Sequence, residues 1–351
     1  MFVALRDLRF AQGRFALMGV VIVLITALVG LLSGLTTGLG RQNVSAITDL
    51  PVDRIAFSGP AQDLSYSDSA VTEAQVRHWA GTEGVVMAEP LGISTTRATA
   101  GGRNAAVSVF GVSPGSELVG DVGDRTVVLS VPAAEELGAT TGDTVTLAGQ
   151  DLTVTAVRGD ACFSHTPVVW TSLGTWRSTA PPGTTATVIA LKTRPDIDVE
   201  AADAVAGTRT TTRDDSLTAI GSYRSENGSL QLMRGFLFVI SALVIGAFFT
   251  VWTIQRSGDI AVLKALGAST GTLLRDALGQ ALVLLVSGTL VGTALAAAAG
   301  TLVRDTVPFL LDPATVLTPA VTTVVLGAFG AALAVRRITT VDPLTALGSA
   351  R

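Results

Sequence analysis

The sequence predicts an α-helical membrane protein with four transmembrane helices and an extracytoplasmic mixed α+β domain between helices 1 and 2. Apolar residues make up 48% of the 351 residues and charged residues only 15%. The mean hydropathy is +0.53, which is high for a soluble chain. Four apolar runs are candidates to cross a hydrocarbon core of about 30 Å. The residues between the first two runs are instead polar and rich in turn-forming residues.

The charge distribution predicts which side of the membrane each part occupies. Residues 41–229 carry 13 basic and 22 acidic side chains, whereas the stretches 1–14, 256–276 and 336–351 together carry 9 basic and 4 acidic ones. Because basic segments beside transmembrane helices stay in the cytoplasm, we expect both termini to be cytoplasmic and the acidic region to lie outside. An acidic outer region also argues against nucleic acid as a partner.

The first 39 residues predict a surface helix followed by a membrane span. Residues 1–14 alternate arginines with apolar side chains, a pattern typical of an amphipathic helix on the inner membrane surface. The apolar run 15–39 is longer than the core of a signal peptide and has no A-x-A-like cleavage site. We therefore expect it to remain as transmembrane helix 1.

Residues 40–229 predict the extracytoplasmic domain. Apolar, β-prone runs indicate strands at 54–58, 105–112, 126–130, 144–147, 152–157, 167–170 and 186–191. Helices are expected at 72–80, 131–137 and 199–205, with turns rich in Gly, Pro, Asp and Thr between the elements. About 190 residues can bury a core of their own. The region shows no Ser/His/Asp arrangement, no paired carboxylates in an apolar setting and no phosphate-binding glycine loop, so we do not expect an enzyme.

The rest of the chain predicts three further spans. We expect transmembrane helices at 230–255, 273–303 and 320–335, a cytoplasmic coupling helix at 256–272, an outer loop at 304–319 and a cytoplasmic tail at 336–351. Small residues four apart, including Gly288 and Gly292, favour close packing of the third helix within a bundle. Arg304, Asp305 and Asp312 are expected to mark the membrane boundary.

The residues most often found in metal sites are scarce. The single Cys162 excludes an intramolecular disulfide and is expected to be a small buried residue. His78 and His165 are the only histidines, do not have the spacing of a metal site, and are expected to be packed or solvated. Trp170 and Trp176 are expected in the core. We therefore predict no metal site.

Several segments resemble the MacB/FtsX-type ABC transporter permeases. The turn ALGAS at 265–269, the closing pattern RRI-x-x-x-DP-x-x-AL at 336–347 and the segment 129–160 carry the resemblance, which covers nearly the whole chain. It implies a homodimeric permease of the bacterial plasma membrane, in contact with lipid and bound to two copies of a cytoplasmic ABC ATPase. ATP would bind to that partner, and its closure would be transmitted mechanically to the outer domain.

The coupling helix is the expected contact with the ATPase. The chain contains no G-x-x-x-x-G-K-[ST] motif, so it needs a separate ATPase. Asp259 and Lys264 are expected to set the orientation of that contact, and Ile260, Leu263 and Leu266 to fill a groove on the partner. The alternative is a helix that lies on the lipid surface.

Residues 6–19 and 221–255 are most similar to the haem-exporting, HrtB-type subgroup of that family. This implies haem as a transported substrate and no intrinsic cofactor. Two alternatives stay open. The first is a non-transporting regulator that transmits ATPase strokes to an extracytoplasmic partner, and the second is an exporter of a lipid, peptide or antibiotic.

The outer end of the second span holds the candidate substrate residues. A carboxylate, phenol or thioether can ligate haem iron and an arginine can pair with a propionate, which selects Tyr223, Arg224, Glu226, Met233 and Arg234. Separations of seven and eight residues place Glu226, Met233 and Arg234 on one helical face. The alternative is that the tyrosine is an interface aromatic, the arginine of the helix reaches the headgroups and the methionine packs against a neighbouring span.

Overall fold

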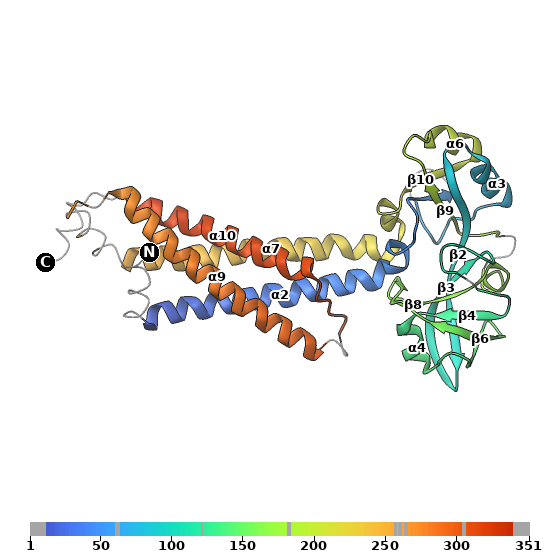
Figure 1. Cartoon of the computed structure of the whole chain (residues 1–351), viewed down its shortest axis with the longest axis horizontal. Coiled ribbons are helices and arrows are strands. Elements are labelled where there is room, and N and C mark those ends of the chain that lie inside the picture. The colour runs from blue at the N-terminus through green and yellow to red at the C-terminus, as the bar shows by residue number, and fades with distance from the viewer. Residues whose placement is uncertain are drawn as a thin grey trace. The chain divides into compact units, whose positions relative to one another are not determined.

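The computed structural model describes residues 12–59, 64–120, 122–180, 184–255, 258, 262, 266–267, 269–303 and 307–339. The chain forms two compact units (Figure 1). The helical unit consists of Met1–Gly38 and Ser229–Arg351, and the globular unit consists of Leu39–Gly228.

Four long helices confirm the predicted membrane class. They are α2 (Gln12–Thr48), α7 (Gly221–Gln255), α9 (Thr270–Val303) and α10 (Pro313–Thr339). Each contains a stretch long and apolar enough to cross a membrane. The helices extend beyond the predicted spans, because α2 continues past residue 39 to Thr48 and α7 begins before residue 230, at Gly221.

The connection between α9 and α10 is shorter than predicted. Residues 304–319 were expected to form an outer loop, but α10 begins at Pro313. A carboxylate oxygen of Asp312 accepts a hydrogen bond from the backbone N–H of Thr315 at 2.6 Å, and proline is well suited to the first helical position. Arg304 and Asp305 lie outside the described residues.

Small residues bring the helices of the helical unit close together. A Cβ atom placed on Gly288 would lie 2.7 Å from Cγ2 of Ile22, and one on Gly292 would lie 2.6 Å from the carbonyl oxygen of Val23. Close approach of α9 to α2 therefore requires glycine at both positions, as the spacing of small residues predicts. All four helices contribute to a buried cluster that includes Phe249.

The segment between α9 and α10 returns to the bundle as an aromatic wedge. The ring of Phe309 occupies the space that a Cβ atom on Gly34 of α2 or Gly300 of α9 would need. A Cβ atom on Gly38 would overlap the backbone carbonyl of Pro308. The glycines thus form a surface on which residues of the connecting segment lie directly against two helices.

The globular unit is built on one ten-stranded mixed sheet with the order β10-β1-β9-β2-β3-β8-β4-β6-β5, in which β7 also pairs with β8 (Figure 1). The strands are β1 (Arg54–Ser58), β2 (Val85–Ala100), β3 (Arg103–Val112), β4 (Thr126–Leu129), β5 (Thr144–Leu147), β6 (Gln150–Val157), β7 (Cys162–Phe163), β8 (Thr166–Ser172), β9 (Val188–Thr193) and β10 (Thr208–Thr212).

Short helices cover part of this sheet and begin at side-chain caps. The predicted helices correspond to α3 (Glu73–Gly81), α4 (Val131–Leu137) and α6 (Val199–Ala206). Their N-caps are Thr72, Ser130 and Asp198, each of which accepts a hydrogen bond from a backbone N–H of the first turn. The sequence did not predict the short α5 (Leu173–Trp176) or the 3-10 helix η1 (Asp215–Ala219).

The sheet separates two buried clusters, because neighbouring strand residues point to opposite faces. Val109 belongs to the first cluster, which also contains Trp176, and Phe110 belongs to the second, which contains Trp170. The second cluster includes apolar residues from the last turns of α2. Trp170, Trp176 and Cys162 are all buried, as predicted.

Candidate functional site

Five polar residues from three separate parts of the chain meet in the globular unit. Asn43 comes from the last turns of α2, Ser164 and His165 form the turn between β7 and β8, and Ser222 and Glu226 lie in the first turns of α7. We call them the turn cluster. They connect the two long helices to the sheet through direct hydrogen bonds.

The turn itself is a two-residue hairpin connection. Ser164 has a φ of +51° and His165 a φ of +62°, the left-handed values that tight two-residue hairpins require. The N–H of Ser164 donates to the carbonyl of Asn43 at 2.9 Å, and the N–H of His165 donates to the carbonyl of Gln42 at 3.2 Å. The turn is therefore fixed against α2 by its own backbone.

Glu226 is held through one of its two carboxylate oxygens. Its Oε2 lies 2.8 Å from Nε2 of His165 and 3.3 Å from Nδ2 of Asn43. Because an ionised carboxylate only accepts hydrogen bonds, the imidazole and the amide are the donors. Among the described residues, Oε1 has no hydrogen-bond partner. The Glu226 side chain is 44% exposed, so this second oxygen is open to an approaching ligand.

Two serines complete the cluster. The hydroxyl of Ser222 donates to Oδ1 of Asn43 at 2.6 Å, and it lies 2.8 Å from the hydroxyl of Ser164. Asn43 thus accepts from one residue of α7 through its oxygen and donates to another through its nitrogen. Its side chain fixes the start of α7 against the end of α2.

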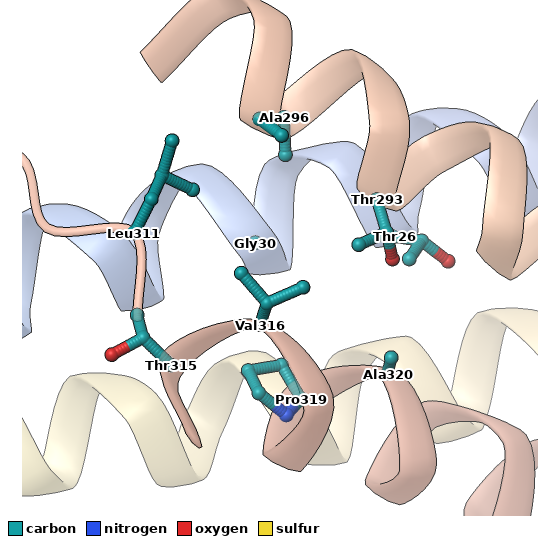
Figure 2. Close-up of a pocket in the computed structure, with 10 residues that line it drawn as sticks. Thr26, Gly30, Thr293, Ala296, Leu311, Thr315, Val316, Pro319 and Ala320 are labelled. Carbon is teal, nitrogen blue, oxygen red and sulfur yellow. The ribbon is translucent and has the colours of Figure 1, made fainter. Parts of the chain in front are cut away.

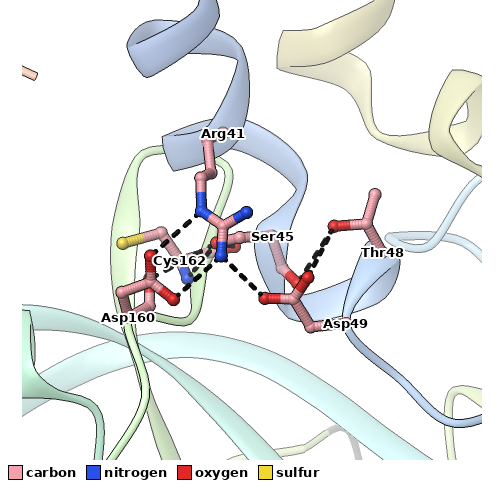
Figure 3. A network of polar contacts seen from close by, with 6 residues as sticks. All are labelled: Arg41, Ser45, Thr48, Asp49, Asp160 and Cys162. Atoms are coloured by element: carbon pink, nitrogen blue, oxygen red, sulfur yellow. Dashed lines mark hydrogen bonds and ion pairs between the residues drawn. The ribbon is translucent and has the colours of Figure 1, made fainter. Parts of the chain in front are cut away.

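A second polar network joins the last turns of α2 to residues 160–162 (Figure 3). The Nε and Nη2 atoms of Arg41 donate to the two carboxylate oxygens of Asp160 at 3.0 and 3.1 Å, and Nη2 also reaches Asp49 at 3.2 Å. The hydrogen bond from Arg41 holds the pKa of Asp160 below its usual value, against the opposing effect of partial burial. The hydroxyl of Ser45 accepts from the backbone N–H of Cys162 at 2.8 Å.

Cys162 joins this network through its backbone, and its thiol is buried. It has no disulfide partner. Burial, followed by the negative charges of Asp160 and Glu136, raises the pKa of Cys162 to about 11. Since the thiolate is the nucleophile and the metal ligand, this environment does not favour either role.

The predicted substrate residues differ in their surroundings. Tyr223 is half-buried and packs against the second core cluster, and Arg224 is exposed. Met233 is 46% exposed. Packing against the core cluster thus explains the position of Tyr223, whereas Glu226 has a carboxylate oxygen, Oε1, without a partner among the described residues.

Arg234 lies within the helical unit and contacts α2. Its Nη2 atom donates to Oγ1 of Thr36 at 2.9 Å and to Oγ1 of Thr37 at 3.4 Å. Its Nε atom is buried without a hydrogen-bond partner, and none of the described acidic residues forms an ion pair with it. A guanidinium group in this setting favours an anionic partner, because isolated charges within membrane spans are costly.

Most of the predicted coupling contact lies outside the described residues, namely Asp259, Ile260, Leu263 and Lys264. Leu266 is described and is 78% exposed. Its N–H donates to the carbonyl of Val262 at 3.0 Å, and Gly267 follows with a φ of +92°. This geometry agrees with a helical turn that ends at glycine.

The helical unit contains a small cavity between α2, α9 and α10 (Figure 2). Its volume is about 10 Å³, and the hydroxyl of Thr26 beside it is buried without a partner. Such a cavity has room for about one water molecule, not for a large substrate. A wider depression of about 600 Å³ lies between α3 and α6 in the globular unit, where Nε2 of His78 is buried without a partner.

Comparison with known proteins assigns the family. Residues 15–209, more than half of the chain, match the MacB-like periplasmic core domain, and residues 232–343 match the FtsX-like permease C-terminal domain. The chain belongs to the MacB/FtsX-type ABC transporter permeases. A permease of this type is a multi-pass membrane protein that depends on an ATPase partner, in line with the four long apolar helices.

Relatives extend the similarity to the whole permease. A putative hemin transport system permease protein, HrtB, of Staphylococcus haemolyticus is 25% identical over 353 residues, which cover 98% of both chains. The HrtB of a Staphylococcus epidermidis strain is 24% identical with the same coverage. An uncharacterised ABC transporter permease of Mycobacterium tuberculosis is 24% identical over 356 residues, or 99% of both chains.

A solved structure also resembles part of the permease. The periplasmic region of MacB from Actinobacillus actinomycetemcomitans aligns with 50% of this chain and 95% of its own, with 14% identity and a TM-score of 0.38. The family assignment rests on the two domain matches.

Only Glu226 of the turn cluster was a predicted site residue, and Asn43, Ser164, His165 and Ser222 were not. His165 was expected to be a lone packed or solvated residue, but it is bonded to Glu226. Asn43 was not singled out at all, because it lies 183 positions from Glu226 in an otherwise ordinary helical stretch. No local pattern in the sequence indicates these contacts.

Proposed function

We propose that this permease exports haem from the membrane and that a separate cytoplasmic ATPase drives the transport. The full-length similarity to putative hemin transport permeases is the observation that carries the proposal, because it covers 98% of both chains. At 25% identity it is supported by chemistry at α7, where one carboxylate oxygen of Glu226 has no partner and the guanidinium of Arg234 has no acidic partner among the described residues.

The proposal includes an arrangement in the membrane. We place both termini in the cytoplasm and the acidic globular unit outside, as the distribution of basic residues favours. Two copies of the permease would assemble with two ATPase subunits and surrounding lipid. ATP-driven closure of the ATPases would then move the coupling helix and the long helices, so that force reaches the globular unit without a wide central pore.

Two candidate positions, one in each unit, could each recognise a part of haem, here the transported substrate and not a resident cofactor. Oε1 of Glu226 can ligate the iron while Oε2 stays bonded to His165 and Asn43. Arg234 can pair with a propionate. Tyr223, Arg224 and Met233 stay as further candidates on the same helix.

A hemin titration tests the proposal. The permease, purified with its ATPase in lipid nanodiscs, is expected to shift the Soret band of hemin stoichiometrically and to hydrolyse ATP faster with hemin present. Glu226→Gln keeps the size of the side chain but removes the carboxylate, and is expected to weaken the shift by at least tenfold in hemin affinity. Glu73→Gln, an exposed position in α3, is the matched control and should leave the titration unchanged.

Three outcomes of the titration would distinguish haem export from the alternative functions. No spectral shift and no ATPase stimulation with the unmodified complex would contradict haem as substrate and favour the non-transporting regulator. Stimulation by a lipid, peptide or antibiotic instead of hemin would identify another exporter. A normal shift with Glu226→Gln would reject the iron ligand while leaving haem export in place.

A further inference from the structure

We infer that the turn Ser164–His165, between β7 and β8, is the joint through which movement of α2 and α7 reaches the sheet of the globular unit. The inference does not depend on haem as the substrate, but it rests on the proposed transmission of ATPase movement through the long helices. It concerns contacts that all lie within the globular unit.

The first side of the joint is α2. Residues 160–165 are bonded to four residues within about two turns of this helix, namely Arg41, Gln42, Asn43 and Ser45. These bonds use both backbone N–H groups of the turn and the bidentate contact between arginine and aspartate. A shift of the helix end therefore displaces β7 and the turn as one piece.

The second side of the joint is α7. Ser222 contacts Ser164 and Glu226 contacts His165, at 2.8 Å in each case. Ser222 and Glu226 are four residues apart and so lie on the same face of the helix. Asn43 bonds to both of them, which links the two helices directly. The turn thus lies between the only two helices that join the globular unit to the spans, among the residues that the structure describes.

The turn leads straight into the centre of the sheet. β8 pairs in parallel with β3 and antiparallel with β4, and its residues Val168 and Val169 are fully buried. Phe163, just before the turn, packs in the same core cluster as Val44 and Ile47 of α2. Because a close-packed interior transmits strain instead of absorbing it, displacement of the turn must alter the strands beside β8.

Hydrogen exchange on the complex with its ATPase tests this transmission. With ATP and vanadate, peptides that cover β3, β4 and β8 are expected to change their exchange rates by at least threefold. The double variant Asn43→Ala/His165→Gly removes the bonds of these two side chains to Ser222 and Glu226 of α7, while the backbone bonds of the turn to α2 remain. Glycine tolerates the left-handed backbone at 165. The double variant is expected to reduce the ATP-dependent change in these peptides at least twofold.

A matched control and a reversible cross-link keep the test independent of folding defects. Thr146→Ala removes a 2.8 Å hydrogen bond to Asp151 in the β5–β6 hairpin, away from both helices, and should change nothing. In a Cys162→Ser background, Ser164→Cys/Ser222→Cys places two thiols where hydroxyls already converge. Added to the double variant, the oxidised pair is expected to restore the ATP-dependent change, and reduction to abolish it.

The inference requires that the contact between Ser164 and Ser222 persists while the helices move, and three results would contradict it. A full ATP-dependent change in the reduced double variant would overturn it. So would loss of the change on oxidation of Ser164→Cys/Ser222→Cys alone, because the contact would then have to open. A complex in which ATP and vanadate leave β8 and its neighbours unaffected would overturn it as well.

Discussion

The Nε2 atom of His165 lies 2.8 Å from Oε2 of Glu226, although 61 positions separate the two residues in the sequence. His165 adopts a φ of +62° in the turn that carries the imidazole. A non-glycine residue in the left-handed region carries a conformational cost of roughly 1 kcal/mol or more. The contact with Glu226 and the bonds of the turn to α2 offset that cost.

Substitution of His165 separates backbone strain from side-chain bonding. His165→Ala and His165→Gly both remove the imidazole, but only glycine relieves the strained backbone. We expect His165→Ala to lower the free energy of unfolding by about 1 kcal/mol more than His165→Gly. Thermal unfolding of the full-length protein, followed in the near-ultraviolet, measures the difference. Equal stability of the two variants would show that the left-handed turn is not maintained.

We predict that the ionised carboxylate of Asp160 contributes to the free energy of unfolding and that this contribution is lost in acid. Its pKa is lowered in the folded protein, mainly by the hydrogen bond from Arg41. The contribution of Asp160 to stability is therefore fully present above the pKa of about 3.9 that an aspartate has in the unfolded chain. It is lost as the pH falls through the lower pKa of the folded protein. Because the pair is largely exposed, we expect only about 0.2–1 kcal/mol.

Unfolding of Asp160→Asn between pH 2.5 and 6 checks this expectation. The variant should be less stable than the parent at pH 6 and should differ little from it at pH 2.5. Asp151→Asn, with its carboxylate on a separate hairpin, is the control. A gap between parent and Asp160→Asn that widens toward low pH would have the wrong sign.

Gly38 tests the packing of the connecting segment on α2. Alanine there would overlap the carbonyl of Pro308, a backbone group that cannot rotate away. Overpacking of this kind costs about 1–3 kcal/mol. Gly19→Ala, in the same helix, meets no atom within 4 Å and should be neutral or stabilising. Melting temperatures in detergent should rank Gly38→Ala clearly below Gly19→Ala, and a reversed order would contradict the close approach.

If Arg234 pairs with a propionate, the affinity of the permease for haem should depend on the free carboxylates of haem. Arg234→Met retains an unbranched side chain but removes the positive charge. We expect the affinity for hemin to fall about tenfold, which corresponds to about 1.4 kcal/mol of binding free energy. Haem dimethyl ester has no free propionates, so the variant and the parent should bind it alike. Spectral titration with both compounds makes the comparison. An equal loss for the ester would assign the arginine to structure and not to recognition.

Much of the globular fold follows from local patterns in the sequence. β1 and β5 have the predicted bounds, because short alternating runs are enclosed by turn residues. β2 was missed, since Pro90 and Gly92 interrupt its pattern, and its 16 residues are held by pairing with β3, β5 and β9. β10, with the sequence TRTTT, has no apolar alternation to reveal it.

The candidate site was only partly predictable, for the same physical reason. Glu226 could be selected because a carboxylate beside an apolar span has a recognisable chemistry. His165 and Asn43 could not, because their partners are brought together by the β7–β8 turn and the ends of two helices. Local periodicity carries no information about such long-range contacts.

The ring of Phe309 belongs to neither of the helices whose glycines it covers. The contact between α2 and α9 at this level therefore includes a ring from the connecting segment. A change in the spacing of these two helices here would also displace Phe309, so a short loop, and not only the two helices, would take part in it.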